Sequence, residues 1–361
     1  MNNEEKLAGI RKQIDALDEQ IQELINARAE CAQQVAEVKH AAGEAVAFYR
    51  PEREADILRT IQKRNKGPLS NEVIARLFRE IISACLALEQ VLKIAFLGPE
   101  GTFTQAATRK HFGQGVETVP QTDIDDVFRE VESGHAHYGV VPIENSTEGV
   151  VNHTLDMFMS TPLKICGEVE LRIHHHLISL ESDLSAINRI YSHQQSLGQC
   201  RKWLDAHLPE TEAVAVSSNA EAAKLAADDP RSAAIASDSA AEIYGLEIIA
   251  DNIEDEPDNT TRFLILGRDN IAASGHDKTS ILCATDNRVG SLHHLLAPLV
   301  KHKVSMTRIE SRPSRRGMWD YVFFIDIEGH ISQPSVSKAL DELQQDASLF
   351  KVLGSYPRAV L

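Results

Sequence analysis

Two hydroxyl side chains and a cation stand together in the stretch Asn259–Phe263, at the start of an apolar run. Thr260, Thr261 and Arg262 follow an acidic turn and precede Leu-Ile-Leu-Gly, a pattern typical of a buried strand. Ligands of α/β domains are held at the ends of strands. A threonine there can donate a hydrogen bond or a proton to a leaving oxygen, and an arginine can pair with a carboxylate. Ordinary strand residues and a surface cation are the alternative on spacing alone.

Similar polar turns follow other short apolar runs in the middle of the chain. They begin near Gly98, Pro142, Ser192 and Ser217, and each is followed by a helical pattern. This repetition of strand, polar turn and helix predicts parallel α/β lobes whose turns line one side of a cleft. Helix capping is the alternative role of these polar residues. In the run His174–His176 only two histidines share one face of a strand, so we expect a structural role and no metal site.

The first ninety residues carry cations within a helical apolar pattern. Apolar residues from Leu7 to Leu24 recur in alternating steps of three and four, which is typical of a helix seam. Arg28 continues the seam, where it could set the register. Lys39 lies eleven residues further on, so its direction around the helix axis differs from that of Arg28 by only about 20°. The two residues are roughly 16 Å apart along the axis, so both side chains could reach one small anion. A helix over residues 3–42 would be on the order of 55 Å long and would need a partner chain, which predicts a homodimer.

Two shorter helices are expected to follow. Pro51 is a suitable first residue for the second helix, and Ser70 is a suitable cap for the third. The third helix should bury a stripe made of Ile74, Phe78, Ile82 and Cys85. Glu89 is the next position on this stripe, so its carboxylate either meets a cation there or reaches solvent at the helix end.

The charged positions of residues 1–92, namely Arg11, Arg28, Lys39, the run Tyr-Arg-Pro-Glu-Arg-Glu at 49–54 and Glu89, together resemble the all-helical chorismate mutases. The resemblance implies a domain-swapped dimer that converts chorismate to prephenate by a pericyclic rearrangement, which needs a charged cage and no nucleophile or cofactor. It implies site residues with three tasks: Arg28 and Arg53, with Arg11 from the other subunit, hold carboxylates; Lys39 and Glu89 donate to the ether oxygen; Glu54 holds the hydroxyl, with Arg50 and Cys85 beside the substrate.

Two positions of this region differ from familiar members of that family. Several members have glutamine where Glu89 stands, and some have an acid where Arg50 stands. A carboxyl group can donate a hydrogen bond only when it is protonated. We therefore expect the mutase rate to fall as the pH rises and Glu89 loses its proton.

The central region, residues 93–275, resembles the prephenate dehydratase domain. Four separated motifs occur in the order of that family: Gly-Pro-Glu-Gly-Thr-Phe-Thr, Ile-Glu-Asn-Ser-Thr-Glu-Gly, Ser-His-Gln-Gln and Asn-Thr-Thr-Arg-Phe. The resemblance implies two α/β lobes like those of periplasmic binding proteins, with prephenate between them and Thr261 as the catalytic threonine. It implies that the substrate is bound by Thr102, Asn145, Ser146, His193, Ser217 and Arg262. Gln194 stands where the family often has proline.

Residues 276–361 show a strand–helix–strand–strand–helix–strand order, which predicts an α+β ferredoxin-like domain. The expected elements are 280–284, 289–303, 304–310, 319–327, 334–346 and 350–356, with a basic turn at 312–317. The segment Met306–Pro313 and the glycine turn before a helix resemble the amino-acid-binding ACT domain. That resemblance implies phenylalanine held between paired domains as a feedback inhibitor, by Gly290, Leu292, Glu310, Ser311 and Arg312.

Composition limits the classes of function. The 361-residue chain has 37 Lys and Arg against 53 Asp and Glu, a net charge of −16, which argues against nucleic acid as a partner. No apolar run approaches the ~20 residues of a membrane span. Five widely spaced cysteines and a polar, acidic N-terminus favour a reducing cytoplasm.

The sequence therefore predicts a three-domain protein of the bifunctional chorismate mutase/prephenate dehydratase type, without metal or cofactor. We expect a homodimer or a dimer of dimers, because the first helix needs a partner. An enzyme that takes arogenate directly to phenylalanine is one alternative. A non-catalytic amino-acid sensor is another, although the intact set of candidate catalytic residues argues against it.

Overall fold

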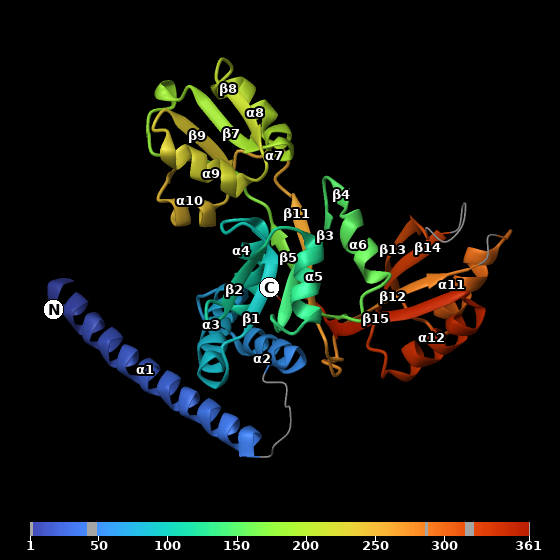
Figure 1. The fold of residues 1–361 in the computed structure, drawn as a ribbon. Helices are drawn as coiled ribbons and strands as arrows, with labels where there is room; N and C mark the ends of the chain where they lie inside the picture. The colour runs from blue at the N-terminus through green and yellow to red at the C-terminus, as the bar shows by residue number, and fades with distance from the viewer. Residues whose placement is uncertain (1–2, 42–48, 286–287, 315–320, 361) are drawn as a thin grey trace.

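The computed structural model of the protein describes residues 3–41, 49–285, 288–314 and 321–360 (Figure 1). N-terminal helices are followed by a two-lobed α/β region and by a C-terminal region with one sheet and two helices. The expected helix end at residue 42, the turn residues 315–317 and the strand start at Trp319 lie outside the described residues.

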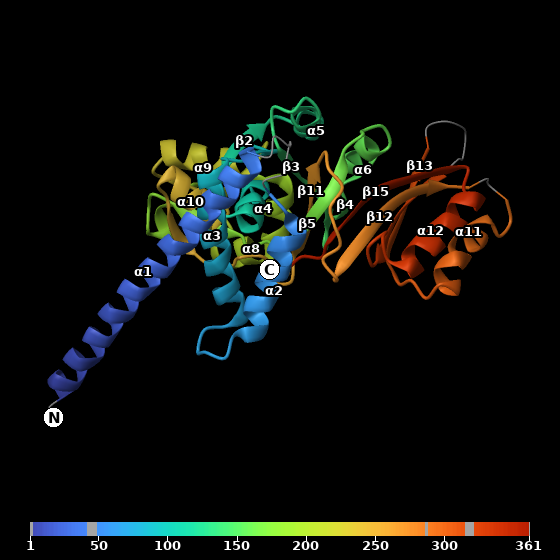
Figure 2. The same ribbon diagram turned by 90° about the horizontal axis from the view of Figure 1, so that it is seen from below.

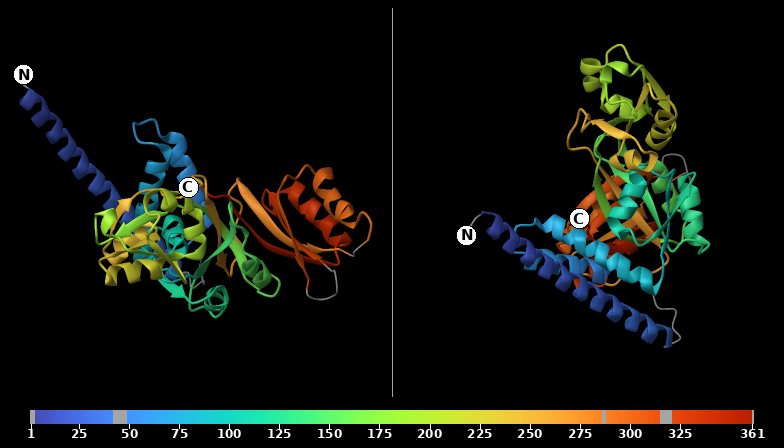
Figure 3. Two further views of the ribbon diagram at one scale, coloured as in Figure 1. Left: turned by 90° about the horizontal axis from the view of Figure 1, so that it is seen from above. Right: turned by 90° about the vertical axis from the view of Figure 1, so that its left-hand side faces the viewer.

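The N-terminal region consists of α1 (Asn3–Ala41), α2 (Pro51–Arg64) and α3 (Asn71–Glu89). Pro51 occupies the first turn of α2, and the Ser70 side chain accepts a hydrogen bond from the Val73 N–H at 3.3 Å, as expected for the two helix starts. α1 packs against α3 near its C-terminal end and extends well beyond the rest of the molecule toward the N-terminus (Figures 1 and 3).

The buried face of α3 differs from the expected stripe. Ala75, Arg79 and Ser83 are its most buried side chains together with Cys85, whereas Ile74, Phe78 and Ile82 are only half-buried. The physical reason is that α3 packs on two sides: one faces the other N-terminal helices, and the other lies against the central region. Periodicity within one helix identifies the first face but not the second.

The first central lobe is built on a mixed sheet with strand order β2-β1-β3-β11-β5, and β4 pairs with β3. One helix covers one face and two cover the other. The strands are β1 (Lys93–Leu97), β2 (Glu117–Gln121), β3 (Tyr138–Asn145), β4 (Gly149–Val150), β5 (Lys164–Arg172) and β11 (Thr260–Gly267), and the helices are α4 (Phe103–Phe112), opposite α5 (Ile124–Glu132) and α6 (Asn152–Phe158).

The second central lobe has the strand order β10-β6-β9-β7-β8, with an alanine-rich core under α9 and α10. The chain passes between the lobes twice, and the two passages are joined by a hydrogen bond from the Ile173 N–H to the Asn259 carbonyl at 2.8 Å. The elements are β6 (His176–Ser179), η1 (Leu184–Ala186), β7 (Arg189–His193), α7 (Gln194–Gln199), α8 (Arg201–His207), β8 (Glu212–Val216), α9 (Asn219–Asp228), β9 (Ser232–Ala236), α10 (Asp238–Tyr244) and β10 (Glu247–Ala250).

The C-terminal region has the predicted ferredoxin-like order. Its antiparallel sheet runs β13-β14-β12-β15; the helices cover one face, and the other face packs on the first central lobe (Figure 2). This packing is close, because a Cβ at Gly354 would lie 2.2 Å from the Ile165 carbonyl oxygen. The elements are β12 (Asp277–Ala284), α11 (Ser291–Lys301), β13 (Met306–Pro313), β14 (Tyr321–Glu328), α12 (Pro334–Asp346) and β15 (Leu349–Pro357).

The expected fold class is confirmed: a helical domain, a two-lobed α/β domain and an α+β ferredoxin-like domain. Among the described residues, no helix combines the length and the apolar character that a membrane span requires.

Candidate active sites

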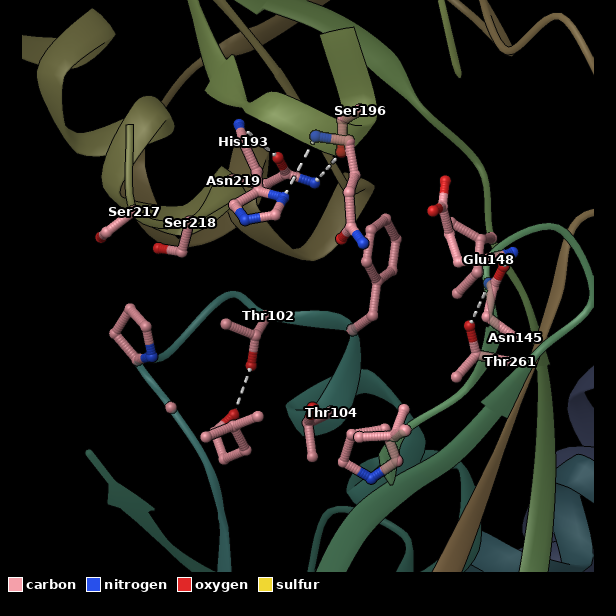
Figure 4. Close-up of a pocket in the computed structure, with 18 of the residues that line it drawn as sticks. Thr102, Thr104, Asn145, Glu148, His193, Ser196, Ser217, Ser218, Asn219 and Thr261 are labelled. Carbon is pink, nitrogen blue, oxygen red and sulfur yellow. Dashed lines mark hydrogen bonds between the residues drawn. The ribbon is translucent and has the colours of Figure 1, made fainter. Parts of the chain in front are cut away.

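A cavity of about 1020 Å³ lies between the two central lobes (Figure 4). Polar strand ends and helix starts from both lobes meet around it, as the repeated polar turns predicted. Five of the expected substrate or catalytic residues line the cavity, namely Thr102, Asn145, His193, Ser217 and Thr261. Side chains from separate motifs are therefore brought to one site by the fold.

Thr261 is held by Asn145, on the neighbouring strand β3. The Asn145 side-chain amide donates to Thr261 Oγ1 at 2.8 Å, and the Asn145 Oδ1 accepts from the backbone N–H groups of Thr147 and Glu148, at 2.9 Å each. These two N–H donors fix which end of the amide faces Thr261. Because Thr261 Oγ1 accepts this bond, its own proton remains available for a ligand in the cavity.

Several residues of this network were not assigned as site residues from the sequence. Asn145 Nδ2 also donates to Asn259 Oδ1 at 2.7 Å, and Asn259 Nδ2 donates to Gln199 Oε1 at 3.3 Å. Gln199 Nε2 in turn donates to Glu148 at 3.1 Å. Gln199 follows the Ser-His-Gln-Gln motif, and Asn259 begins the Asn-Thr-Thr-Arg-Phe motif. Closeness to these motifs in the sequence was the available sign that both residues belong to the site. Pairing across the two lobes is a long-range property that motif spacing does not contain.

His175 lines the cavity, although the histidine run was expected to have a structural role. Its Nε2 contacts Gln199 Oε1 at 2.8 Å, and its ring packs edge-on against Phe103 with ring centroids 5.5 Å apart. Burial lowers the pKa of His175, which favours the neutral imidazole. Among the described residues, no group of three potential ligands is placed to hold a metal ion.

The second lobe contributes helix starts to the cavity. The His193 side chain caps α7 by accepting from the Gln195 N–H at 3.3 Å, and the His193 N–H donates to Asn219 Oδ1 at 3.0 Å. The Ser217 hydroxyl bonds to Glu221, which together with the Ser217 N–H lowers the pKa of that carboxyl. The expected capping role and a position at the cavity therefore occur together.

Two expected substrate-binding residues do not line this cavity. The Ser146 hydroxyl accepts from the Thr260 N–H at 3.0 Å, and the Ser146 N–H donates to the Thr260 carbonyl, so this residue fastens β3 to β11. Arg262 lies on the face of β11 opposite Thr261, because side chains alternate along a strand. Its guanidinium contacts Glu168, Asp326 and the Tyr356 hydroxyl, at 2.8, 2.6 and 3.0 Å. The expectation that Arg262 contacts substrate is therefore corrected.

A second cavity, of about 460 Å³, lies among the N-terminal helices. The predicted convergence of cations from α1 with charges on the two shorter helices is found there. Seven of the expected mutase residues line it: Arg28, Lys39, Arg50, Arg53, Glu54, Cys85 and Glu89.

The two carboxylates of this cavity are held differently. Glu89 Oε2 lies 3.8 Å from Lys39 Nζ and has no hydrogen-bond partner among the described residues. Glu54 is 8% exposed, and its Oε1 lies 3.3 Å from the Nε of Arg79, a residue that the sequence did not single out. Burial raises the pKa of Glu54, although Arg79 and Arg28 oppose this effect.

Arg11 lies far from this cavity in its own chain. It precedes Arg28 by seventeen positions, which corresponds to about 25 Å along α1. The apolar seam of the same segment is open: Leu7, Ile10, Ile14 and Leu17 are at least half exposed, at 54, 52, 50 and 55%. A contribution of Arg11 to catalysis therefore requires a second chain.

The expected effector residues fall on two separate parts of the C-terminal region. Gly290 is the N-cap of α11, with a positive φ of 81°, and Leu292 lies in the first turn of that helix; neither residue lines the nearby cavity of about 440 Å³. Glu310, Ser311 and Arg312 lie on the sheet-edge strand β13 and do not line that cavity. The expected phenylalanine site is not assembled within one chain.

Two arginines of β13 connect this sheet to the first central lobe. Arg312 Nη2 lies 2.6 Å from Asp156, on α6. Arg308 Nε lies 2.9 Å from Glu144, which directly precedes Asn145 on β3. Two ion pairs thus connect β13 to α6 and to β3, the strand that carries Asn145.

Comparison with known proteins divides the chain in the same order. Residues 10–90 match the family chorismate mutase type II, residues 94–271 match prephenate dehydratase, and residues 279–345 match the ACT domain. A bifunctional chorismate mutase/prephenate dehydratase of Pseudomonas aeruginosa is 57% identical over 100% of both chains. One from Neisseria gonorrhoeae is 51% identical over 99% of each. The crystal structure of a prephenate dehydratase from Arthrobacter aurescens in complex with L-Phe is similar with a TM-score of 0.69 and 36% identity, over 74% of this chain and 90% of that one.

Proposed function

The chain belongs to the family of bifunctional chorismate mutases/prephenate dehydratases, and from this premise we propose how its two cavities divide the work. The helical cavity rearranges chorismate to prephenate. The cavity between the central lobes converts prephenate to phenylpyruvate by loss of CO₂ and water. The C-terminal domain binds phenylalanine, which then inhibits the enzyme by feedback.

The dehydratase proposal depends on the hydrogen bond from Asn145 to Thr261. As the bond from the ring to the carboxylate breaks, CO₂ is released and the electron pair of that bond enters the ring. The C–O bond at the opposite ring carbon then breaks, and its electron pair stays on the departing hydroxyl oxygen. Thr261 donates its proton to the departing oxygen, which leaves as water, and the threonine recovers a proton from solvent. Aromatisation drives the reaction, so modest acid assistance is sufficient. Thr102, His193 and Ser217 are proposed to bind the substrate.

The mutase proposal is a cage for a dianion, because a pericyclic reaction requires no covalent intermediate. Arg28 and Arg53 pair with the carboxylates, with Arg11 of a second copy, while Lys39 and protonated Glu89 donate to the breaking ether bond. Glu54 accepts from the substrate hydroxyl. Arg50 and Cys85 lie in the wall of the same cavity.

We also propose a homodimer or dimer of dimers, a cytoplasmic location, and domains at residues 1–92, 93–275 and 276–361. The open seam of α1 supports the dimer, and five free, widely separated cysteines support the reducing compartment. Phenylalanine is proposed to bind between paired C-terminal domains, contacted by Gly290, Leu292, Glu310, Ser311 and Arg312.

The deciding experiment supplies the full chain with chorismate and follows prephenate and phenylpyruvate separately, with and without phenylalanine. We expect both products, with phenylpyruvate suppressed by phenylalanine. Thr261→Ala should abolish phenylpyruvate formation while prephenate still accumulates and still binds. Undiminished phenylpyruvate formation by Thr261→Ala would contradict the proposed role. Turnover of arogenate but not prephenate would instead change the substrate.

A further inference from the structure

Arg79 is a buried cation on α3 that lies between the mutase cavity and the dehydratase domain. It is 7% exposed, and its Nε forms an ion pair with Glu54 Oε1 at 3.3 Å, without a hydrogen bond from that Nε–H among the described residues. Its Nη1 donates to the backbone carbonyls of Lys110 and His111, at 2.8 and 2.7 Å. One guanidinium therefore joins a carboxylate of the mutase cavity to the last turn of α4.

The contact between α3 and the end of α4 is closely fitted. Glu80 and Ser83 accept hydrogen bonds from the backbone N–H groups of Gln114 and Gly115, both at 3.0 Å. A Cβ at Gly115 would lie 2.6 Å from the Ser83 carbonyl oxygen, so glycine permits this approach. Carbonyls at a helix C-terminus lack intrahelical partners and carry partial negative charge, which a cation satisfies. The dehydratase domain thus fixes the direction of the Arg79 side chain.

The charges around Glu54 give Arg79 an electrostatic task. Burial raises the pKa of the Glu54 carboxyl, whereas Arg79 and Arg28 lower it. Burial also raises the pKa of Tyr49 and lowers that of His111, so both groups are neutral near pH 7. The further titratable groups around the small cavity on this side of Glu54, on β5 and near the C-terminus, are Cys166, Glu168 and Arg358, and burial raises the pKa of the Cys166 thiol.

We propose that Arg79 is a positioning residue for the mutase reaction, held in place by the dehydratase domain. Arg79 places its positive charge beside the Glu54 carboxylate and favours the ionised form, which can accept the substrate hydroxyl; the inference therefore rests on the role proposed for Glu54. At the other end of the same ten-residue helix, Thr102 lines the dehydratase cavity. α4 thus extends from the carbonyls that contact Arg79 to the dehydratase cavity.

The test is Arg79→Gln in the full chain, which removes the charge and keeps a hydrogen-bonding amide. Mutase rates are measured against pH in the Glu89→Gln background, so that this second carboxyl does not titrate. We expect kcat/KM at pH 7 to fall by about 10²-fold. The acid limb of the profile should move upward by about one to three pH units. The dehydratase rate on supplied prephenate should stay within about twofold of the parent.

Ser83→Ala is the matched control, because it removes one bond of the same interface without contacting Glu54. Its acid limb should coincide with that of the parent. An unmoved limb in folded Arg79→Gln, or an equal movement in Ser83→Ala, overturns the proposal. If the glutamine variant does not fold, Arg79→Lys decides. An unchanged mutase rate there overturns the proposal, because lysine cannot reproduce the guanidinium geometry. Full mutase activity of Glu54→Gln would instead overturn the role of Glu54 itself.

Discussion

Single hydrogen-bond directions decide the chemistry of the dehydratase site. Asn145 can donate to Thr261 because its carbonyl end is occupied by two backbone N–H groups. The threonine proton is thereby left for the substrate. Had Thr261 been the donor in this bond, the same distance would leave no acid for the leaving oxygen.

Asn145→Asp should therefore be as harmful as Asn145→Ala, although aspartate has nearly the same shape. A carboxylate cannot donate, and it would draw the Thr261 proton toward itself while facing two N–H donors on its other oxygen. We expect both variants to lower the dehydratase kcat by about 10²-fold. Steady-state kinetics with prephenate measures this, and the mutase activity of the same preparation is the control. An active Asn145→Asp would show that the donor is not required.

Glu89 gives the second prediction at this scale. Its Oε2 has no hydrogen-bond partner among the described residues and lies at the mutase cavity. If Glu89 must donate to the ether oxygen, the mutase rate should fall as the pH rises. Glu89→Gln should then retain activity on the alkaline side, because an amide donates at every pH. Glu72→Gln, at the exposed start of α3, should leave the profile as it is; an unaltered profile in Glu89→Gln would refute the role.

Among the elements, α1 is notable because the apolar seam on its surface is not covered by other described parts of its own chain. The residues 3–41 form a single helix whose seam was predicted from the three- and four-residue steps alone. Arg11 stands on this helix, far from the cavity that it is expected to complete. Dimer formation and mutase activity should therefore be lost together.

Ile14→Asp places a charge on this seam and should yield a monomer. We expect the mutase kcat/KM to fall by roughly 10²-fold or more, because each cavity loses the Arg11 of its partner, while dehydratase activity persists. Sedimentation velocity and the two enzyme assays measure these outcomes. Ala16→Asp, which adds the same charge on the outer side of α1, is the control. A monomer with full mutase activity would exclude a shared site.

The type of an element could be predicted wherever its apolar residues followed a single helical or strand periodicity. The prediction failed where an element packs against two domains at once. The helix starts at Pro51 and Ser70 follow from local chemistry. β2 (Glu117–Gln121) was missed, because a short strand containing Pro120 lacks a clear alternation. Arg79 could not be singled out, because its partners are carbonyls of another domain. Arg262 was placed beside its neighbour Thr261 in function, whereas strand alternation separates them.

At the scale of the whole molecule, ion pairs centred on Arg262 join the dehydratase domain to the C-terminal domain. This residue joins Glu168 of the dehydratase sheet to Asp326 of the regulatory sheet, and Lys278 Nζ lies 2.9 Å from the same Glu168 oxygen. Glu168 and Asp326 are 3 and 6% exposed, so neither carboxylate has access to bulk water as an alternative partner. The regulatory domain is therefore attached by charge as well as by its apolar face.

Arg262→Ala should destabilise the folded chain by about 3–5 kcal/mol, because it takes the ion-pair partner from the buried Asp326 carboxylate and leaves Lys278 as the ion-pair partner of Glu168. Arg172→Ala, on the exposed end of the neighbouring strand, should cost less than about 1 kcal/mol. Urea unfolding at pH 7 measures the difference. A cost of Arg262→Ala no larger than that of Arg172→Ala would contradict the role of the cluster.

The stabilisation that Arg262 contributes should also depend on pH in a definite direction. Burial opposes ionisation of Asp326, but Arg262, Ser280 and Arg308 outweigh it and hold the pKa of Asp326 below its ordinary value. The stabilisation is therefore complete above the ordinary aspartate pKa of about 3.9, and it is lost as the pH falls through the depressed value. The difference between parent and Arg262→Ala should shrink as the pH falls, beginning at the higher pKa that burial gives Asp326 once Arg262 is removed and ending at the depressed pKa of the parent.

β11 turns Thr261 toward the cleft and Arg262 toward the regulatory domain. Because successive side chains of a strand alternate, insertion or deletion of one residue within β11 would exchange the two. A guanidinium would then enter the cleft, and a hydroxyl would face Asp326. Catalysis and attachment of the regulator thus depend on one alternation: a change of two residues keeps both faces of β11, whereas a change of one keeps them only if a β-bulge absorbs it, as bulges do in the neighbouring strands β3 and β5.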